Sequence, residues 1–344
     1  MKHISLLILM CALLSFTGCE VGMAGDEVTN ERELNISVVG SRATTNVKES
    51  KIVSLRIFVC SKEGIIEVDQ DTIDNEGIQM PCLLSMKISR TNKLLYVIAN
   101  SKQYLPDRNL VGENISIVNQ LTIGSDGIYN SEILPFTGSQ VINDVSTDKL
   151  YANVELIRCV SKIEMRIKKS EDVTVPVTLL STSLANTSQK SFLLPQNIDW
   201  GIKYSPGGLI YANTEISSLY TDLENGFSET SASMKPVYLF EHAPIAKNDS
   251  LIATSLKVSL RVNSSIKSYT IPIINSSSDD SYYGVVRNRI TYMDISFTSR
   301  GLLNVTYSVI PWELEEEYDR ELGDEEAFKV IDWISEDMQN TELG

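Results

Sequence analysis

The sequence predicts an all-β protein made of two β-sandwich domains in tandem, with a few short helices and an acidic C-terminal tail. Apolar and polar residues alternate over many short segments, turn-forming clusters such as residues 205–208 and 276–281 separate them, and helical periodicity is rare. A chain of 344 residues is long enough for two domains. We place the N-terminal domain at residues 34–167, the C-terminal domain at residues 168–312 and the tail at residues 313–344.

Residues 1–18 have the pattern of an export signal. A short positive start precedes an apolar run over residues 4–14, which is too short to cross a bilayer, and small residues lead into Cys19. This arrangement resembles the lipobox of bacterial lipoproteins, with Phe16 where leucine is usual. We therefore expect Cys19 to carry a lipid anchor and residues 19–33 to form a flexible tether; an ordinary secretory signal is the alternative.

The first predicted strand covers residues 34–39, with Leu34, Ile36 and Val38 on one face. A polar loop that contains Arg42 follows it. The same alternation predicts further strands at residues 52–60, 83–88, 94–99, 151–167, 236–241, 256–262, 268–274, 289–297 and 302–310.

Helices are predicted at residues 112–121 and 217–224, and in the tail. In the tail, Asp324 is a candidate N-cap. If the tail were a strand, Asp332 would share a face with Val330, which interrupts the apolar alternation. A helix would instead gather on one side the apolar residues Phe328, Ile331, Ile334 and Met338.

The negative charge is concentrated in the tail. The chain carries a formal charge of −15, and residues 313–344 hold thirteen acidic residues against Arg320 and Lys329. No basic patch with interleaved aromatic residues occurs, so we expect no nucleic-acid partner.

The sequence predicts neither a metal site nor a cofactor. Cys60, Cys82 and Cys159 have no zinc-ligand spacing, and we expect Cys60 and Cys159 to be buried, with one disulfide left open. The acidic run at residues 69–76 departs from a calcium-binding loop, because Ile73 stands where an oxygen ligand is needed. A solvated loop is the favoured interpretation of that run.

No enzymatic activity is predicted. Once the signal is removed, His242 is the only histidine, and no nucleophile or phosphate-binding motif accompanies it. Thr72 and Ser250 each lie in a three-residue sequence similar to the O-glycosylation acceptor of Bacteroidetes. Both would need to be exposed to be modified.

Several of these segments, in this order and spacing, resemble the fimbrillins, the subunits of Bacteroidales fimbriae (type V pili). The matching features are the lipobox at Cys19, the loop at residues 41–43 (SRA) and the segments at residues 54–59 (SLRIFV), 95–100 (LYVIAN), 135–138 (PFTG), 156–164 (LIRCVSKIE), 286–289 (VRNR) and 305–313 (VTYSVIPWE). The resemblance implies two transthyretin-like β-sandwich domains. It also implies a lipid-anchored precursor at the outer membrane and a mature subunit in a fimbrium.

The resemblance further implies a mechanism of assembly. In this family an arginine-specific protease cuts the loop after the first strand, that strand leaves, and a strand of another subunit fills the groove. In this sequence the cut would separate Arg42 from Ala43 and release the strand that contains Leu34, Ile36 and Val38. The implied partners are other copies or related subunits, the protease, and an adhesion partner on a host or bacterial surface.

The tail leaves the role within a fimbrium open. Stalk subunits of the family end in an extended donor segment after the Pro-Trp pair, whereas here an acidic stretch with helical periodicity follows Pro311 and Trp312. The alternatives are a stalk subunit, an anchor or tip that does not donate a strand, and a surface lipoprotein that binds a glycan or a host protein.

Overall fold

The computed structural model describes residues 31–40, 47–124, 128–129, 133–143, 147–195, 204–205, 209–215, 217–218, 221–222, 237–241, 245–246, 252–274, 276, 282–314 and 329–336. Cys19, Arg42, Ala43, Ser250 and His242 lie outside the described residues, as does the expected export signal.

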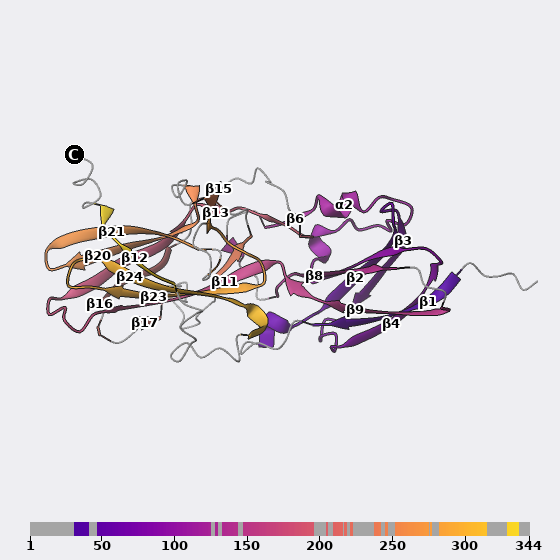
Figure 1. Ribbon diagram of the computed structural model, residues 1–344, viewed down its shortest axis with the longest axis horizontal. Helices are drawn as coiled ribbons and strands as arrows, with labels where there is room; N and C mark the ends of the chain where they lie inside the picture. The colour runs from indigo at the N-terminus through magenta and orange to yellow at the C-terminus, as the bar shows by residue number, and fades with distance from the viewer. Residues whose placement is uncertain are drawn as a thin grey trace, which may run out of the picture.

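The described chain is almost entirely β, as the alternating patterns predict, and its sheets form two groups that follow each other along the long axis (Figure 1). Helical turns are short: η1 (Val47–Ser50), η2 (Lys102–Tyr104), α2 (Ser116–Asn119) and η4 (Trp312–Leu314). No helix in the described parts of the chain is both long and apolar enough to cross a membrane.

The first group contains a three-stranded sheet in the order β4-β1-β9 and a five-stranded sheet in the order β10-β8-β5-β2-β3. Their strands are β1 (Glu31–Val39), β2 (Ser54–Ser61), β3 (Ile66–Ile73), β4 (Cys82–Ser89), β5 (Lys93–Ala99), β8 (Phe136–Ile142), β9 (Lys149–Glu155) and β10 (Ile157–Arg158). All neighbours in these sheets are antiparallel except β1 and β9, which run parallel.

The second group contains a seven-stranded sheet, in which β17 pairs with β11 beside the path β25-β24-β23-β11-β18-β7, and a four-stranded sheet in the order β16-β12-β20-β21. Their strands are β7 (Ile128–Tyr129), β11 (Val160–Lys169), β12 (Val177–Ala185), β16 (Leu209–Glu215), β17 (Thr221–Asp222), β18 (Val237–Phe240), β20 (Ser255–Val262), β21 (Ser265–Pro272), β23 (Arg289–Phe297), β24 (Leu303–Pro311) and β25 (Lys329–Trp333).

Short two-stranded ladders complete the topology. They pair β6 with β14, β13 with β15, and β19 with β22. Their bounds are β6 (Thr122–Ile123), β13 (Thr187–Ser188), β14 (Ser191–Phe192), β15 (Tyr204–Ser205), β19 (Ile245–Ala246) and β22 (Tyr282–Tyr283).

Two hydrophobic clusters fill the two groups, and the first cluster also takes in residues of the second group's sheet, such as Phe240 and Ile290. The chain passes from the sheets of the first group to those of the second at Cys159. The single strand predicted at residues 151–167 is divided into β9, β10 and β11. Whereas β10 pairs with β8 in the first group, β11 pairs with β18 and β23 in the second, and its Ile163 and Ile167 lie in the second cluster. The expected N-terminal domain of residues 34–167 therefore includes most of β11, which the structure pairs with strands of the second group.

The helix predicted in the tail is wrong over residues 329–333, which form β25 and pair antiparallel with β24. Ile331 and Trp333 pack against the second hydrophobic cluster, while Asp332 and Val330 face away from it. The odd-numbered residues therefore supply the apolar face. Pairing with the edge of β24 satisfies the backbone of this segment better than a short isolated helix would.

Two other local predictions are corrected by the structure. Within the stretch at residues 217–224 the described part contains β17, not a helix. The acidic run that begins at residue 69 is not a solvated loop at its start, because Asp69 and Asp71 lie within β3. The side chain of Asp69 is 3% exposed and pairs with Arg56 on β2.

Candidate functional site

The first strand, β1, is the interior strand of its sheet. It pairs antiparallel with β4, for example Ile36 with Leu84, and parallel with β9, for example Ile36 with Ala152. Within the described parts of the chain, β1 is the only strand paired with β4 or with β9. Loss of β1 would therefore leave two separate strands, each with unpaired backbone groups facing the gap.

The side chains of β1 alternate strictly between the core and the outer face. Leu34, Ile36 and Val38 are 0%, 1% and 0% exposed and lie in the first hydrophobic cluster. Burial of an aliphatic side chain of this size contributes about 1.5–3 kcal/mol. The three residues that the alternation predicts to face the core therefore make β1 a substantial part of the core of the first group.

Gly138 brings the two sheets of the first group close together beside β1. A Cβ atom at this position would lie 2.5 Å from the backbone oxygen of Glu155 and 2.6 Å from Cγ1 of Val154, both on β9. Only glycine permits this approach of β8 to β9. The contact joins β9 to the five-stranded sheet independently of β1.

The outer face of β1 forms the floor of a shallow hollow of about 650 Å³. Asn35 and Ser37 have short side chains, whereas Leu83 on β4 and Tyr151 on β9 project on either side of them and are 77% and 76% exposed. Solvent-exposed apolar side chains that border a groove are common where another chain binds.

Glu33 lies on this outer face, in the same row of β1 as the exposed Glu31. Ser85 Oγ donates a hydrogen bond of 2.9 Å to Glu33 Oε1, and Lys149 Nζ lies 3.3 Å from Glu33 Oε2. The hydrogen bond from Ser85, followed by the contact with Lys149, lowers the pKa of Glu33. Glu33 is therefore ionised at neutral pH and links β1 to both of its neighbours.

Of the predicted cleavage and glycosylation sites, Thr72 lies among the described residues, whereas Arg42, Ala43 and Ser250 lie outside them. Thr72 is half-buried in β3, where it pairs with the core-facing Leu55. The other arginine near β1, Arg32, is 3% exposed inside the strand, and its guanidinium donates a hydrogen bond of 3.2 Å to the backbone oxygen of Thr91. A protease would have no access to the backbone at Arg32 while β1 is paired.

Four of the segments that carried the family resemblance meet where the two groups join. Arg158 is completely buried, with its guanidinium 4.5 Å from the ring centroid of Trp312 and 5.4 Å from that of Phe136. Asn288 accepts a hydrogen bond of 3.1 Å from the backbone N–H of Arg158, and its backbone oxygen accepts another of 3.1 Å from Trp312. A buried cation stacked on two rings is a strong and specific contact. These residues hold the two groups together at their junction.

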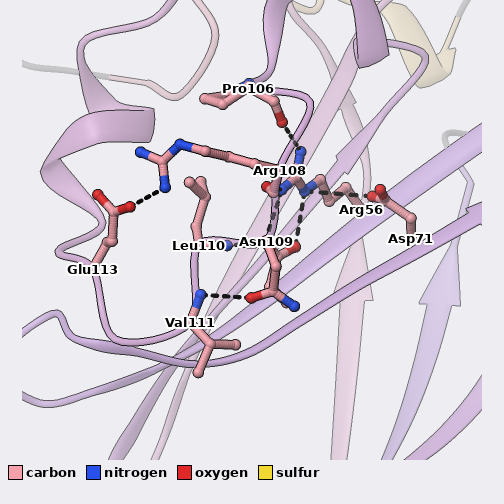
Figure 2. Close-up of polar contacts among 9 residues, drawn as sticks. Arg56, Asp71, Pro106, Arg108, Asn109, Leu110, Val111 and Glu113 are labelled. Atoms are coloured by element: carbon pink, nitrogen blue, oxygen red, sulfur yellow. Dashed lines mark hydrogen bonds and ion pairs between the residues drawn. The ribbon is translucent and has the colours of Figure 1, made fainter.

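A second candidate site lies under the segment at residues 101–115, where Arg56 ties that segment to the five-stranded sheet (Figure 2). The guanidinium makes two hydrogen bonds of 2.8 Å to Asp69 and one of 2.6 Å to each of the backbone oxygens of Pro106 and Arg108. The Leu110 N–H donates a hydrogen bond of 2.7 Å to Asp69. The bond with Asp69 raises the pKa of Arg56, which stays charged.

A hollow of about 520 Å³ opens beside this network. Its lining combines the apolar Ile73 and Leu105 with the charged Arg56, Asp71 and Lys102. A volume of this size suits a small ligand. No local sequence pattern predicts this site, because its residues come from segments that are far apart in the chain.

The cysteines do not form a reactive centre. Cys60, Cys82 and Cys159 are all free, so the disulfide that was left open is absent among them. Burial raises the pKa of Cys60 to about 12 and that of Cys159 to about 11, and it also raises the pKa of Cys82. All three are therefore neutral thiols at pH 7. The described residues contain no group of three or more His, Cys, Asp or Glu side chains that could hold a metal ion.

Solved structures share this fold, although no protein-family model and no curated protein matches the sequence. The tip fimbrial protein Mfa3 of Porphyromonas gingivalis, solved with a C-terminal truncation, has a TM-score of 0.56 at 14% identity and covers 82% of this chain and 100% of its own. A fimbrilin from Porphyromonas gingivalis W83 has a TM-score of 0.54 at 15% identity and covers 82% of this chain and 97% of its own. At these identities the similarity establishes the fold, which agrees with the fold that the family resemblance implied.

Proposed function

We propose that the chain is a structural subunit of a cell-surface fimbrium that polymerises by strand exchange and supports adhesion and biofilm formation. The observation that carries this proposal is that, among the described strands, β1 alone connects β4 and β9, while the five-stranded sheet of the first group does not pair with it. A strand with this position can be replaced by an equivalent strand without rebuilding the fold. The shared fold with fimbrial proteins supports the same role.

The exchange would begin with hydrolysis of the peptide bond between Arg42 and Ala43 by an arginine-specific protease. Before this cut, β1 is covalently joined to the rest of the chain, and its return to the groove is an intramolecular step. After the cut, the segment that ends at Arg42 is held by non-covalent contacts, namely its backbone pairs, the buried Leu34, Ile36 and Val38, and the polar contacts of Arg32 and Glu33. A strand of another copy can then displace β1 from the groove, because neither strand is covalently joined to the subunit that holds it.

The C-terminal segment is the best candidate for the incoming strand. β25 is already extended, and in the described sheet it is the last strand of the order, hydrogen bonded to β24 on one side. β24 belongs to the opposite half of the molecule from β1, so a donated tail and an emptied groove would lie toward different ends of one subunit (Figure 1). Such an arrangement supports head-to-tail growth.

The export pattern and Cys19 fit the same scheme. Lipid on Cys19 would hold the precursor at the outer membrane, and the cut after Arg42 would release the subunit from its anchor, since Cys19 precedes the cut. A single cleavage would thereby release the subunit from its lipid anchor and allow β1 to leave the groove.

A second candidate function is that of a surface lipoprotein, anchor or tip, that binds a glycan or a host protein and does not polymerise. The hollow beside Arg56 favours it, because a rigid network holds its walls and both apolar and charged side chains line it. Heating without a reducing agent distinguishes the two functions. A strand-exchange polymer gives a ladder on a gel at low temperature that collapses on boiling, whereas a monomer gives one band at every temperature.

Substitution of the cut site tests the leading function. We expect Arg42→Ala to leave the precursor folded, because the change lies outside β1, and to abolish the ladder. Arg42→Lys should also block an arginine-specific protease, and Arg261→Ala is the matched control, since Arg261 is exposed on β20, away from β1 and β25. A ladder of normal length from Arg42→Ala would contradict the proposed processing.

A further inference from the structure

Two lysines face each other across β1 at the outer face of the groove. The register places Glu33 opposite Lys87 on β4 and opposite Lys149 on β9. Both lysines are exposed, and the Lys149 ammonium lies 3.3 Å from the Glu33 carboxylate. Glu33 is therefore the anion between two cations in the intact chain.

Release of β1 removes this anion and leaves the cations in place. Glu33 precedes Arg42 and departs with the cut segment, whereas Lys87 and Lys149 belong to strands that remain. With two strand spacings between them, the lysines are roughly 10 Å apart across the gap, near enough to repel each other at low salt. The vacated groove thus attracts a strand that brings a carboxylate to this position.

The tail of a second copy has the required pattern. Along the part that the structure describes, one row alternates apolar and acidic residues in the order Val330, Asp332, Ile334, Glu336. Val330 is 56% exposed in β25, on the face that also carries Asp332. The net negative charge of residues 313–344 complements the lysine pair.

The hollow on the outer face explains how such a row is accommodated. The short side chains of Asn35 and Ser37 leave it unfilled between Leu83 and Tyr151. An incoming strand with a valine or isoleucine two residues from its carboxylate would cover these two exposed side chains, which β1 does not. The incoming strand can therefore fit the outer face better than the strand it replaces.

We infer that Lys87 and Lys149 form a carboxylate-binding pair that selects the acidic C-terminal strand of a second copy and sets its register. This inference rests on the proposed strand exchange and adds the residues that recognise the incoming strand. The pair acts as a specificity determinant: a strand without a carboxylate at this position leaves two cations unpaired, and a strand shifted by one residue turns its acidic row toward the core.

Charge reversal on both partners tests the inference. We expect Lys87→Glu/Lys149→Glu to form the ladder about tenfold more slowly after cleavage, because like charges then face each other across the strands. These changes also repel Glu33 and loosen the cut β1, so slower assembly cannot result from a tighter hold on β1. Asp332→Lys/Glu336→Lys should be similarly slow, and the chain that carries all four changes should return to within about threefold of the wild-type rate.

Lys62→Glu/Lys190→Glu is the matched control, since it makes the same charge change at exposed positions away from β1 and from both hollows. Circular dichroism melts confirm that each variant is folded. Wild-type assembly speed in Lys87→Glu/Lys149→Glu, or no recovery in the fourfold variant, would overturn the inference and leave strand exchange intact. Absence of any ladder from the cleaved wild-type chain would overturn the proposed function, and the inference with it.

Discussion

Cys82 is a reporter for the occupancy of the groove. It pairs with Val38 across β1 and β4, and it is half-buried against the first hydrophobic cluster. Burial raises the pKa of this thiol, and removal of β1 takes away part of that burial. Both the accessibility of Cys82 and the fraction of thiolate should increase once β1 leaves.

We therefore predict that maleimide at pH 8 labels Cys82 about tenfold faster in the cleaved, strand-free chain than in the precursor. Cys60 and Cys159 are internal controls, because they are fully buried and their pKa values are raised to about 12 and about 11. Peptide mass spectrometry locates the label. Equal labelling of Cys82 before and after cleavage would mean that β1 stays in place.

Gly138 offers a prediction about the framework around the groove. Because a Cβ would approach the Glu155 backbone oxygen to 2.5 Å, Gly138→Ala forces β8 and β9 apart. We expect the free energy of unfolding to fall by about 1–3 kcal/mol, measured by urea denaturation. Ser139→Ala is the control, since Ser139 is the exposed neighbour in the same strand. An unchanged urea midpoint for Gly138→Ala would contradict the close packing of the two sheets.

For single residues, the sequence predicts which side chains of a strand face the core, but it does not predict which distant side chains pair with each other. The alternation of Leu34, Ile36 and Val38 identifies a half-buried strand because the side-chain period of a strand is two. For Asp69 the acidic run predicts a solvated loop, whereas the structure buries its side chain. The burial depends on Arg56, a partner thirteen residues earlier on the neighbouring strand. Local composition carries no information on such a pair.

At the scale of elements, β1 and β25 show why one strand was predicted and the other was not. The strict alternation of β1 predicts it as a strand. Its parallel pairing with β9, more than a hundred residues away, is seen only in the fold. The tail has apolar residues at both helical and strand spacings, and the free edge of β24 decides between them. Tertiary pairing overrides a weak local preference.

Truncation of the tail distinguishes its packing within its own subunit from its proposed donation to another subunit. A chain that ends at Leu314 loses β25 and the packing of Ile331 and Trp333 against the second cluster, so we expect its melting temperature to fall by several degrees. The same chain keeps a groove but has no strand to donate. Added to wild-type protein before cleavage, it should shorten the ladder in proportion to its share.

The double variant Ile331→Ala/Trp333→Ala is the companion to the truncation, because it weakens the apolar face of β25 but keeps the acidic row. Its ladder should be shortened less than that of the truncated chain. A ladder of full length from mixtures with the truncated chain would contradict the assignment of the tail as the donated strand.

At the scale of the whole molecule, the proposed strand exchange requires a framework that stays folded while β1 is replaced. Arg158, Trp312 and Asn288 join the two groups through buried contacts that none of the β1 residues shares. The all-β architecture followed from periodicity and turn residues. The passage between groups at Cys159 did not, because the alternation predicts one strand over residues 151–167, although the apolar face changes from the even-numbered Ala152, Val154 and Leu156 to the odd-numbered Ile163, Met165 and Ile167.

The mass of the subunit inside the polymer is the most direct test of whether β1 is cut off and replaced by a strand of another subunit. Bands of the ladder, excised without boiling and then dissociated by heat, are analysed by intact mass and N-terminal sequencing. The account predicts a subunit that begins at Ala43 and a polymer that contains no peptide from Glu31–Val39. Polymers in which every subunit still carries β1, whether joined to the chain or bound as a cut fragment, would show that the strand is never exchanged.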